Sequence, residues 1–331
     1  MKVRDIGEFA LIRVIQGMVE KESSAEEAPF PLVLGIGDDA AAWQSREATE
    51  LATTDTLVED VHFRHDFTSW DDLGWKAVAV NLSDIAAMGG VPLYALVTLG
   101  LRPETEVEEV RGLYRGMLSA CRGYGCRIAG GDLVRSPVTF ITVAMTGIAS
   151  GHLLTRRDAQ PGDVVAATGH LGCAAGGLRA LLQGQSPEGE SAKHLHKAHV
   201  RPSPRLAEGQ VLVQQGVRAA MDISDGLIDD LSRMCVASGV GAVVYADQVP
   251  VDAFLRESFP QDCLSLALDG GEDYELLFAA SKEVVSRVVA RLAIPVSVLG
   301  TIVADHPGEV RVVDGYGAEL HIDQRGWDHF R

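Results

Sequence analysis

The chain has 331 residues, a formal net charge of −17 and 47% apolar side chains. Its length favours two domains with sizeable cores, and its acidity argues against a nucleic-acid backbone or an anionic membrane as its main partner. No run is long and apolar enough to span a bilayer, and the first residues lack a signal-peptide layout. With five cysteines and no C-x-x-C motif, we expect reduced thiols and a cytoplasmic protein.

Residues 1–150 are expected to form the first domain, in which strands and helices follow each other without strict alternation. The predicted helices are 5–20, 76–90 and 106–123. The predicted strands are 32–36, 51–54, 93–99, 126–129 and 138–148. This mixed order indicates an α/β (α+β) fold with mixed or antiparallel sheets and helices packed on one face.

Residues 151–331 are expected to form the second domain, with a similar mixture of elements. The predicted strands are 163–167, 219–223, 242–245, 274–279, 296–299 and 310–313. The polar stretch 183–198 is interpreted as a surface loop. It contains His194 and His196, with His199 just beyond, and for these three exposure is a better interpretation than metal binding because no cysteine or carboxylate pattern lies nearby.

The predicted helix 76–90 is apolar almost all the way round and ends at Gly89–Gly90, which is typical of a buried helix. Asn81, Ser83 and Asp84 nevertheless lie within it. A buried carboxylate must be paired, hydrogen-bonded or bound to a metal, because desolvating a bare charge is costly. Asp84 is therefore either a core residue bound by a lysine or by backbone amides, or a metal ligand.

Further aspartates recur where apolar strands are expected to end, several of them next to glycine. They are Asp38, Asp39, Asp55, Asp132, Asp222 and Asp225. A single aspartate there is usually a helix cap, and Asp225 before Gly226 fits that interpretation. Ligands collect at the carboxyl edge of α/β sheets, however, and hard carboxylate oxygens suit Mg²⁺ held together with substrate phosphates.

The sequence lacks a phosphate-binding P-loop, a dinucleotide-binding G-x-G-x-x-G after a strand, a protein-kinase H-R-D and a G-x-S-x-G. No Ser–His or Cys–His pairing stands out. In phosphoryl transfer the protein mainly positions groups and neutralises charge, and an acceptor phosphate is already largely ionised at neutral pH. Many aspartates with few bases therefore predict a kinase whose acceptor is a phosphate, with no catalytic acid or base.

The chain resembles the thiamine-monophosphate kinase family, which belongs to the superfamily of aminoimidazole ribonucleotide synthetase. The resemblance covers essentially the whole chain and rests on motifs in the family's order: GEFALI, GIGDDAA, TTDTLVEDVHF, NLSDIAAMGG, GGD, LTRRDAQPGD, RPSPR, MDISDGL, GGEDYEL and GWDHF. It implies ATP-dependent phosphorylation of thiamine monophosphate to thiamine diphosphate with several Mg²⁺ ions. It also implies a homodimer joined through the N-terminal, ATP- and Mg-binding domains, and a C-terminal domain that completes the site.

The resemblance also implies a role for individual residues. The implied metal ligands are Asp39, Thr53, Thr54, Asp55, Asp84, Asp132, Asp222 and Asp225. The implied ATP contacts are Tyr114, Gly131, Asp132, Arg156 and Ser224. The implied substrate contacts are His62, Glu272 and Trp327. Each has a structural alternative: the hydroxyls as caps or sheet contacts, Tyr114 as core, Arg156 as a surface ion pair, His62 as a loop hydrogen-bonder and Trp327 as an anchor for the C-terminus.

Two positions differ from the family pattern. Asp60 stands where the family usually has glycine, and its carboxylate either faces a substrate phosphate near His62 or points to solvent. Leu133 and Val134 replace two threonines after GGD. The alternatives to the kinase are another ATP-using relative, such as a selenophosphate synthetase or an aminoimidazole ribonucleotide synthetase, and a non-catalytic module that binds divalent cations.

Overall fold

The computed structural model of the chain contains two compact units. Unit 1 comprises Met1–Ile85 and Val91–Ala149, and unit 2 comprises Ala86–Gly90 and Ser150–Arg331. The structure describes residues 2, 5, 8–22, 32–34, 42–43, 48–185 and 188–320. Both units combine helices with sheets that contain antiparallel and parallel pairs, which confirms the predicted fold class.

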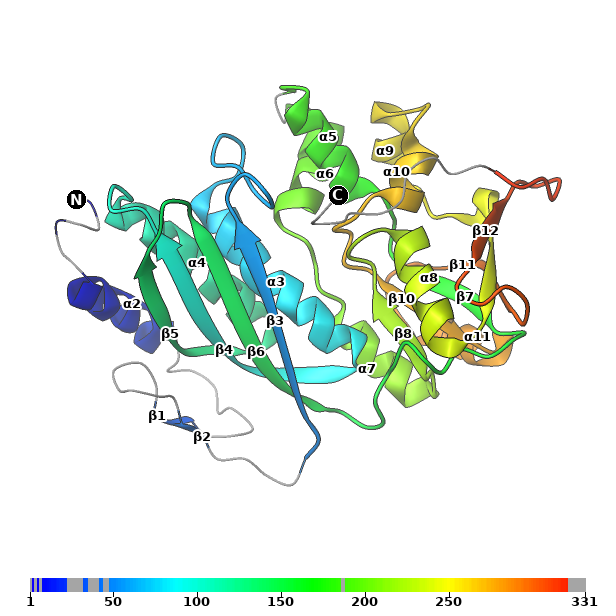
Figure 1. The fold of residues 1–331 in the computed structure, drawn as a ribbon, viewed down its shortest axis with the longest axis horizontal. Helices are drawn as coiled ribbons and strands as arrows, with labels where there is room; N and C mark the ends of the chain where they lie inside the picture. Colours follow the sequence, from blue (N-terminus) through cyan, green and yellow to red (C-terminus); the bar gives the residue numbers. More distant parts are fainter. Residues whose placement is uncertain are drawn as a thin grey trace. The chain divides into compact units, whose positions relative to one another are not determined.

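Unit 1 is built on a four-stranded sheet with the strand order β3-β6-β4-β5, and it also contains a two-stranded antiparallel sheet, β1-β2 (Figure 1). The strands of this unit are β1 (Leu32–Leu34), β2 (Ala42–Trp43), β3 (Glu50–Val58), β4 (Gly90–Leu101), β5 (Arg127–Arg135) and β6 (Phe140–Ala149). β3 and β6 pair antiparallel, whereas β4 and β5 pair parallel. β3 and β5 are therefore the two edge strands of the sheet.

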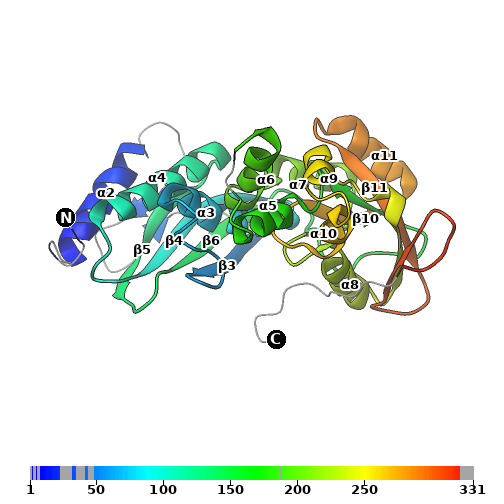
Figure 2. The ribbon, with the colours of Figure 1, turned by 90° about the horizontal axis from the view of Figure 1, so that it is seen from above.

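The helices of unit 1 all lie on one face of this sheet (Figure 2). They are α2 (Glu8–Glu22), α3 (Trp70–Ala87) and α4 (Val107–Tyr124). α3 and α4 approach closely through glycines: a Cβ on Gly74 would lie 1.9 Å from the Leu113 carbonyl, and one on Gly116 would lie 1.8 Å from the Asp71 carbonyl. This close contact presses α3 and its buried polar residues onto the sheet.

Unit 2 contains a six-stranded sheet with the order β12-β9-β11-β7-β10-β8. Its strands are β7 (Val164–Thr168), β8 (Ala219–Asp222), β9 (Gly241–Tyr245), β10 (Leu276–Ala280), β11 (Val296–Val303) and β12 (Val310–Val313). β8 and β10 are buried at every position, so this sheet is covered on both faces. Figure 2 shows α8 and α11 on its opposite sides, which differs from the one-sided arrangement of unit 1.

Seven α-helices of unit 2 surround this sheet among the described residues. They are α5 (Cys173–Leu182), α6 (Glu190–Val200), α7 (Leu206–Gln215), α8 (Leu227–Ser238), α9 (Ala253–Ser258), α10 (Cys263–Asp269) and α11 (Lys282–Arg291), with one short 3-10 turn, η1 (Ala246–Gln248). Alternate strand residues such as Val165 and Ala167 share one core with Leu227 and Leu231 of α8. Ala166 is equally buried and points to the other face, because side chains alternate along a strand.

Two expectations about secondary structure are wrong. The stretch 183–198 is not a loop throughout, because Glu190–Val200 forms α6, whose Leu195, His199 and Val200 are buried. Asp55 and Asp132 do not end their strands but lie inside β3 and β5, because the alternating residues that follow them continue the strand. Asp222 does end β8, as expected.

None of the described helices has the length and apolar character needed to cross a membrane. All five cysteines are free and buried, which agrees with the expectation of reduced thiols.

Candidate functional site

Thr53 and Asp55 of β3 share the sheet face that carries the helices, between the buried Leu51 and Leu57. Asp84 of α3 meets them there. The Thr53 hydroxyl donates a hydrogen bond to Oδ2 of Asp84, and the carboxyls of Asp55 and Asp84 are themselves hydrogen-bonded. Residues from two sequence motifs are thus brought together.

The two carboxyls of this cluster cannot both ionise easily. Burial, the charge of Asp84 and the hydrogen bond to it together raise the pKa of Asp55 to about 7, with burial as the largest cause. A shared proton is the usual outcome when like charges meet in a partly desolvated site. A bound cation would replace that proton, and three oxygen donors of this kind are what Mg²⁺ prefers.

Thr54 and Asp132 lie on the opposite face of the same sheet. Thr54 is exposed and alternates with Thr53 along β3, so their hydroxyls cannot bind one ion together. Asp132 pairs in register with Thr98, on the face where Leu96 and Val134 are 38% and 39% exposed. Since strands are about 4.8 Å apart, β3 and β5 are separated by roughly 14 Å, and Asp132 does not join Asp55 within one chain.

The turn after β3 fixes His62. The backbone N–H of Val58 donates to Nδ1 of His62 at 3.1 Å, so the ring's other nitrogen, Nε2, carries the proton of the neutral form. Asp60 in the same turn has a left-handed φ of 64° and is exposed to solvent. This backbone conformation explains why glycine suits the position, and the exposure favours the interpretation that the Asp60 carboxylate points to solvent.

Tyr114 lies on α4 and is only 4% exposed. Burial raises the pKa of its phenol well above the ordinary value. Its position is that of a core residue. Gly131 is exposed on β5, and a Cβ there would lie 1.9 Å from the Val97 carbonyl, so a side chain would disrupt the pairing with β4.

In unit 2, the segment after β8 is joined to the GGEDYEL segment by backbone hydrogen bonds. Glu272 N–H donates to the Ser224 carbonyl and Tyr274 N–H to the Ile223 carbonyl, each at 2.8 Å. A Cβ on Gly271 would lie 2.6 Å from the Ser224 carbonyl, so glycine permits this close approach. The junction places Ser224 directly beside Glu272.

Asp225 is held by an arginine. Nη1 of Arg233 on α8 donates to its carboxylate and also lies 3.2 Å from Oδ1 of Asp230. Asp230 is fully buried and accepts hydrogen bonds from the backbone N–H groups of Ser224, Asp225 and Gly226 at 3.0–3.2 Å. Asp230 therefore shapes the loop, although the sequence reasoning passed over it. Burial is the main cause that raises the pKa of Asp230 to about 6.

Glu272 and Asp273 have different roles in spite of their adjacency. Oε2 of Glu272 lies 3.1 Å from Nδ1 of the buried His199 on α6. Asp273 accepts hydrogen bonds from the N–H groups of Gly172 and Ala174 at the start of α5, at 2.6 and 3.3 Å. Burial raises the pKa of Asp273 to about 8, so its carboxyl is a helix anchor that is easily protonated.

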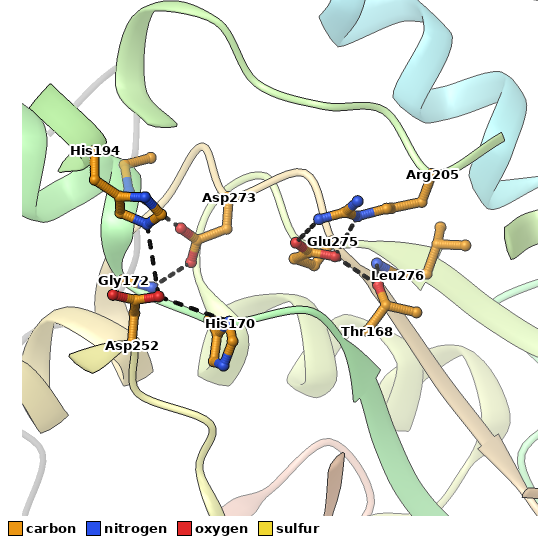
Figure 3. Close-up of polar contacts among 10 residues, drawn as sticks. Thr168, His170, Gly172, His194, Arg205, Asp252, Asp273, Glu275 and Leu276 are labelled. Carbon is orange, nitrogen blue, oxygen red and sulfur yellow. Dashed lines mark hydrogen bonds and ion pairs between the residues drawn. The ribbon is translucent and has the colours of Figure 1, made fainter. Parts of the chain in front are cut away.

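Arg205 and Glu275 form a partly buried bidentate ion pair that sequence reasoning also missed (Figure 3). Thr168 donates to Oε2 of Glu275 at 2.7 Å and accepts from the N–H of Leu276 at 2.9 Å. A Cβ on Gly169 would lie 2.0 Å from the same carboxylate. The motifs RPSPR and GGEDYEL are thus connected by a structural ion pair, for which the charged residues inside both motifs were the only signal.

Comparison with known proteins identifies the family. The sequence profile of the AIR synthase related protein N-terminal domain matches residues 37–149, and that of the C-terminal domain matches residues 160–313. Thiamine-monophosphate kinase of Escherichia coli K12 is 37% identical over 98% of both chains. The chain belongs to the thiamine-monophosphate kinase family. A kinase of this family from Stenotrophomonas maltophilia K279a has a crystal structure with 36% identity and a TM-score of 0.80, over 93% of this chain and 96% of that one.

A second solved family member, AaThiL complexed with AMPPCP and TMP, is 31% identical with a TM-score of 0.78. The match covers 100% of this chain and 99% of that chain. Among the residues that the kinase family motifs imply, Asp222 is buried at the end of β8 and Arg156 is exposed in unit 2. Asp39 and Trp327 lie outside the described residues.

Proposed function

We propose that this chain transfers the γ-phosphoryl group of ATP to the phosphate of thiamine monophosphate, forming thiamine diphosphate and ADP. Family membership supports the reaction. The observation that carries it is the contact between the carboxyls of Asp55 and Asp84, with Thr53 beside them, in a partly buried position. Such a group of oxygens suits a cation that binds two phosphates better than it suits acid–base chemistry.

The proposed cofactor is Mg²⁺, in several copies. The oxygens of Thr53, Asp55 and Asp84 fit it, because they are hard donors and because ionisation of both carboxyls needs a neighbouring positive charge. When bound, Mg²⁺ neutralises the charge of the phosphates. Asp222 and Asp225 of unit 2 and Asp39 are proposed as further ligands. Asp225 would exchange its Arg233 partner for the metal.

No side chain is proposed as a general base. The acceptor oxygen belongs to a phosphate whose second pKa is about 6, so it is largely ionised at neutral pH. The chain's own residues therefore bind and orient the two substrates. Gly131, Asp132, Arg156 and Ser224 are the proposed nucleotide contacts. Tyr114 is proposed with them, and its buried position implies that it acts by supporting the nucleotide site from within α4.

His62, Glu272 and Trp327 are proposed for the thiamine side of the substrate. The Glu272 carboxylate can accept a hydrogen bond from an exocyclic amine, and its contact with His199 positions it. An indole such as Trp327 offers a face to a cationic ring. The proposed compartment is the cytoplasm, in keeping with five cysteines that form no disulfide.

The proposed assembly is a homodimer joined through unit 1. Leu96 and Val134 are exposed on the sheet face opposite the helices. Both edge strands of the sheet, β3 and β5, carry proposed site residues on this face or next to it. If β5 of each copy lies near β3 of the other, Asp132 of the partner subunit comes next to Thr54, on the sheet face that the two residues share and beside the strand that carries Asp55. This arrangement accounts for family ligands that one chain keeps roughly 14 Å apart.

A complementation experiment tests this arrangement. Asp55→Asn and Asp132→Asn proteins are each inactive alone, and unfolding and refolding them together forms mixed dimers. If Asp132 acts across the interface, one of the two sites in each mixed dimer is intact, and activity recovers to about a quarter of the wild-type value. Mixtures that stay inactive, with mixed dimers shown by mass spectrometry, would place Asp132 in the same chain's site.

The direct test of the reaction supplies ATP, Mg²⁺ and thiamine monophosphate and measures thiamine diphosphate by chromatography. Thiamine diphosphate and ADP are expected in equal amounts, with none in the presence of a chelator. Thiamine and thiamine diphosphate serve as control acceptors and are expected to give no product. Folded protein that forms no thiamine diphosphate would overturn the proposal.

A further inference from the structure

A second cluster of metal-binding side chains lies in unit 2, among residues that have no role in the proposed reaction. Cys173, His194 and Asp252 each offer one ligand atom, and these atoms all lie within 4.8 Å of one another. Figure 3 shows His194 and Asp252 at this place, beside Gly172 and His170. We propose that Cys173, His194 and Asp252 bind a zinc ion.

The fold brings two of these residues together through the backbone. Leu171 and Val251 form an isolated parallel β-bridge, and the Leu171 N–H donates to the Pro250 carbonyl at 2.9 Å. Two residues beyond Leu171, Cys173 begins α5, and directly after Val251, Asp252 caps α9. The bridge therefore fixes the thiol and the carboxylate side by side.

The third residue arrives on α6, which packs tightly on α5. A Cβ on Gly177 would lie 2.2 Å from the Leu195 carbonyl, so glycine allows the two helices to approach. Ser191 of α6 donates to Glu257 of α9 at 2.6 Å, and the His194 ring lies 4.9 Å from the Phe254 ring. Three helices thus each supply one ligand from a defined position.

The donor set selects the kind of metal. Thiolate, imidazole and carboxylate together are typical of Zn²⁺, whereas Mg²⁺ avoids sulfur, so the ion of the proposed kinase reaction does not compete for this site. Zinc bonds of 2.0–2.3 Å in a tetrahedron separate the ligand atoms by about 3.3–3.8 Å. Nε2 of His194 and Oδ2 of Asp252 are already 3.5 Å apart, and because no separation exceeds 4.8 Å, the ligand atoms need to close by about 1 Å at most.

The surroundings favour a cation and let it enter. Cys173 is 6% exposed, and the pKa of its thiol is raised by burial and by the charges of Asp273, Asp252 and Glu275. Zinc binding would release the thiol proton to solvent and offset these negative charges. The side chains of His194 and His170 are 43% and 44% exposed, so the ion can reach the site from water.

His170 acts as an outer partner of the site. Its Nδ1 lies 3.8 Å from Oδ2 of Asp252, on the carboxylate that would bind the zinc. Groups in this position orient a ligand, and their loss typically weakens metal binding 10–100-fold. Capping of α9 accounts for Asp252 without a metal, but it does not account for a buried thiol and an imidazole placed against the same carboxylate.

The test is cobalt substitution of the full-length protein in excess Mg²⁺, which occupies the aspartate sites. Co²⁺ bound through a thiolate gives a charge-transfer band in the near ultraviolet together with the visible bands of a tetrahedral site, whereas Co²⁺ on carboxylates alone gives no thiolate band. We expect the thiolate band in the wild-type protein and its displacement by one equivalent of Zn²⁺. Cys173→Ser should remove the band.

Matched variants separate the site from its neighbours. Cys263→Ser removes another buried thiol of unit 2 and should leave the band intact. His194→Ala should weaken Zn²⁺ binding by more than about 100-fold, His170→Ala by about 10–100-fold, and His196→Ala on the same helix should not change it. His194 is exposed, so its variant keeps the fold even if Cys173→Ser does not.

Melting curves supply a second readout. Zn²⁺ at about a hundred times its dissociation constant should raise the melting temperature of the wild-type protein by about 5–10 °C and leave that of His194→Ala unchanged. Absence of the thiolate band in folded wild-type protein would overturn the proposal. A band that persists in Cys173→Ser, or Zn²⁺ binding unaffected by His194→Ala, would also overturn it.

Discussion

The acidic residues of the two units are stabilised in opposite ways. In unit 1, the partly buried Asp55 has another carboxyl, that of Asp84, beside it, and burial together with that carboxyl raises its pKa to about 7. In unit 2, Glu275 is bound by both arms of Arg205, and Asp225 is bound by Arg233. The comparison teaches that a buried acidic residue in a family motif is a metal ligand or a structural anchor depending on the neighbour that the fold supplies.

Removing the arginine of the unit 2 ion pair should have the largest effect on stability. Arg205→Leu leaves Glu275 buried without its guanidinium, and we expect the free energy of unfolding to fall by about 3–5 kcal/mol in urea titrations. Arg179→Leu is the matched control, because its ion pair with Asp262 is exposed and should contribute less than about 1 kcal/mol. Equal losses in the two variants would show that Arg205–Glu275 is not a structural anchor.

Removing a carboxylate of unit 1 should affect catalysis rather than stability. Asp84→Asn takes one negative charge from the proposed metal-binding cluster, and kcat/KM for thiamine diphosphate formation should fall by about 100–1,000-fold. Its melting temperature without metal should stay equal or rise, because the repulsion with Asp55 disappears. Asp262→Asn, an exposed residue, is the control. A variant that loses stability and keeps its rate would make Asp84 a structural residue.

The shared proton of unit 1 predicts a pH dependence. The Asp55 pKa is about 7 in the folded protein and 3.8 as the ordinary value, so between these values the folded state binds more protons than the unfolded state. Stability in a chelator should therefore fall as the pH rises from 4 to 8, by about 2–4 kcal/mol from this residue. The difference between the wild-type stability curve and that of Asp55→Asn gives the contribution of Asp55, and bound Mg²⁺ should make this contribution smaller. Identical slopes for both proteins would contradict the shared proton.

The smallest expected effect concerns Asp60. Asp60→Gly relieves a left-handed φ of 64° and should raise the free energy of unfolding by about 0.5 kcal/mol. Because the Asp60 side chain is exposed, the rate should stay within a factor of two of the wild type, roughly the scale of a surface substitution. Asp66→Gly, at a position of the same segment without a left-handed φ, should lower stability instead. A large gain in rate would show that the Asp60 carboxylate does repel the substrate phosphate.

The sequence predicted the elements well where local signals mark them. The capping box at Glu106 and the left-handed Gly125 delimit α4 within a residue or two of the expected 106–123. Local sequence signals did not predict α6. Its polar, histidine-rich sequence becomes helical because Gly177 of α5 allows the two helices to pack closely against each other. That packing joins two separate helices, so no local pattern predicts it.

The candidate site residues also divide into those whose position follows from local sequence and those whose position depends on tertiary packing. The meeting of Asp55 with Asp84 follows from two motifs that each place a carboxyl in an apolar element. The separation of Thr54 from Thr53 follows from strand alternation, which becomes visible only once β3 is known to continue past Asp55. The pairs Arg233–Asp225 and Arg205–Glu275 depend on tertiary packing, so the sequence shows the charged residues but not which of them pair.

The GGEDYEL segment holds two residues with side chains in left-handed conformations, Glu272 at φ 68° and Tyr274 at φ 51°. Each costs about 1–2 kcal/mol, which the backbone bonds to Ser224 and Ile223 offset. Two backbone hydrogen bonds therefore hold the segment in a strained conformation. Breaking either hydrogen bond would let the segment relax and move Glu272 away from His199. Hydrogen exchange at the amides of Glu272 and Tyr274 should therefore measure how often the segment opens before any substrate is added.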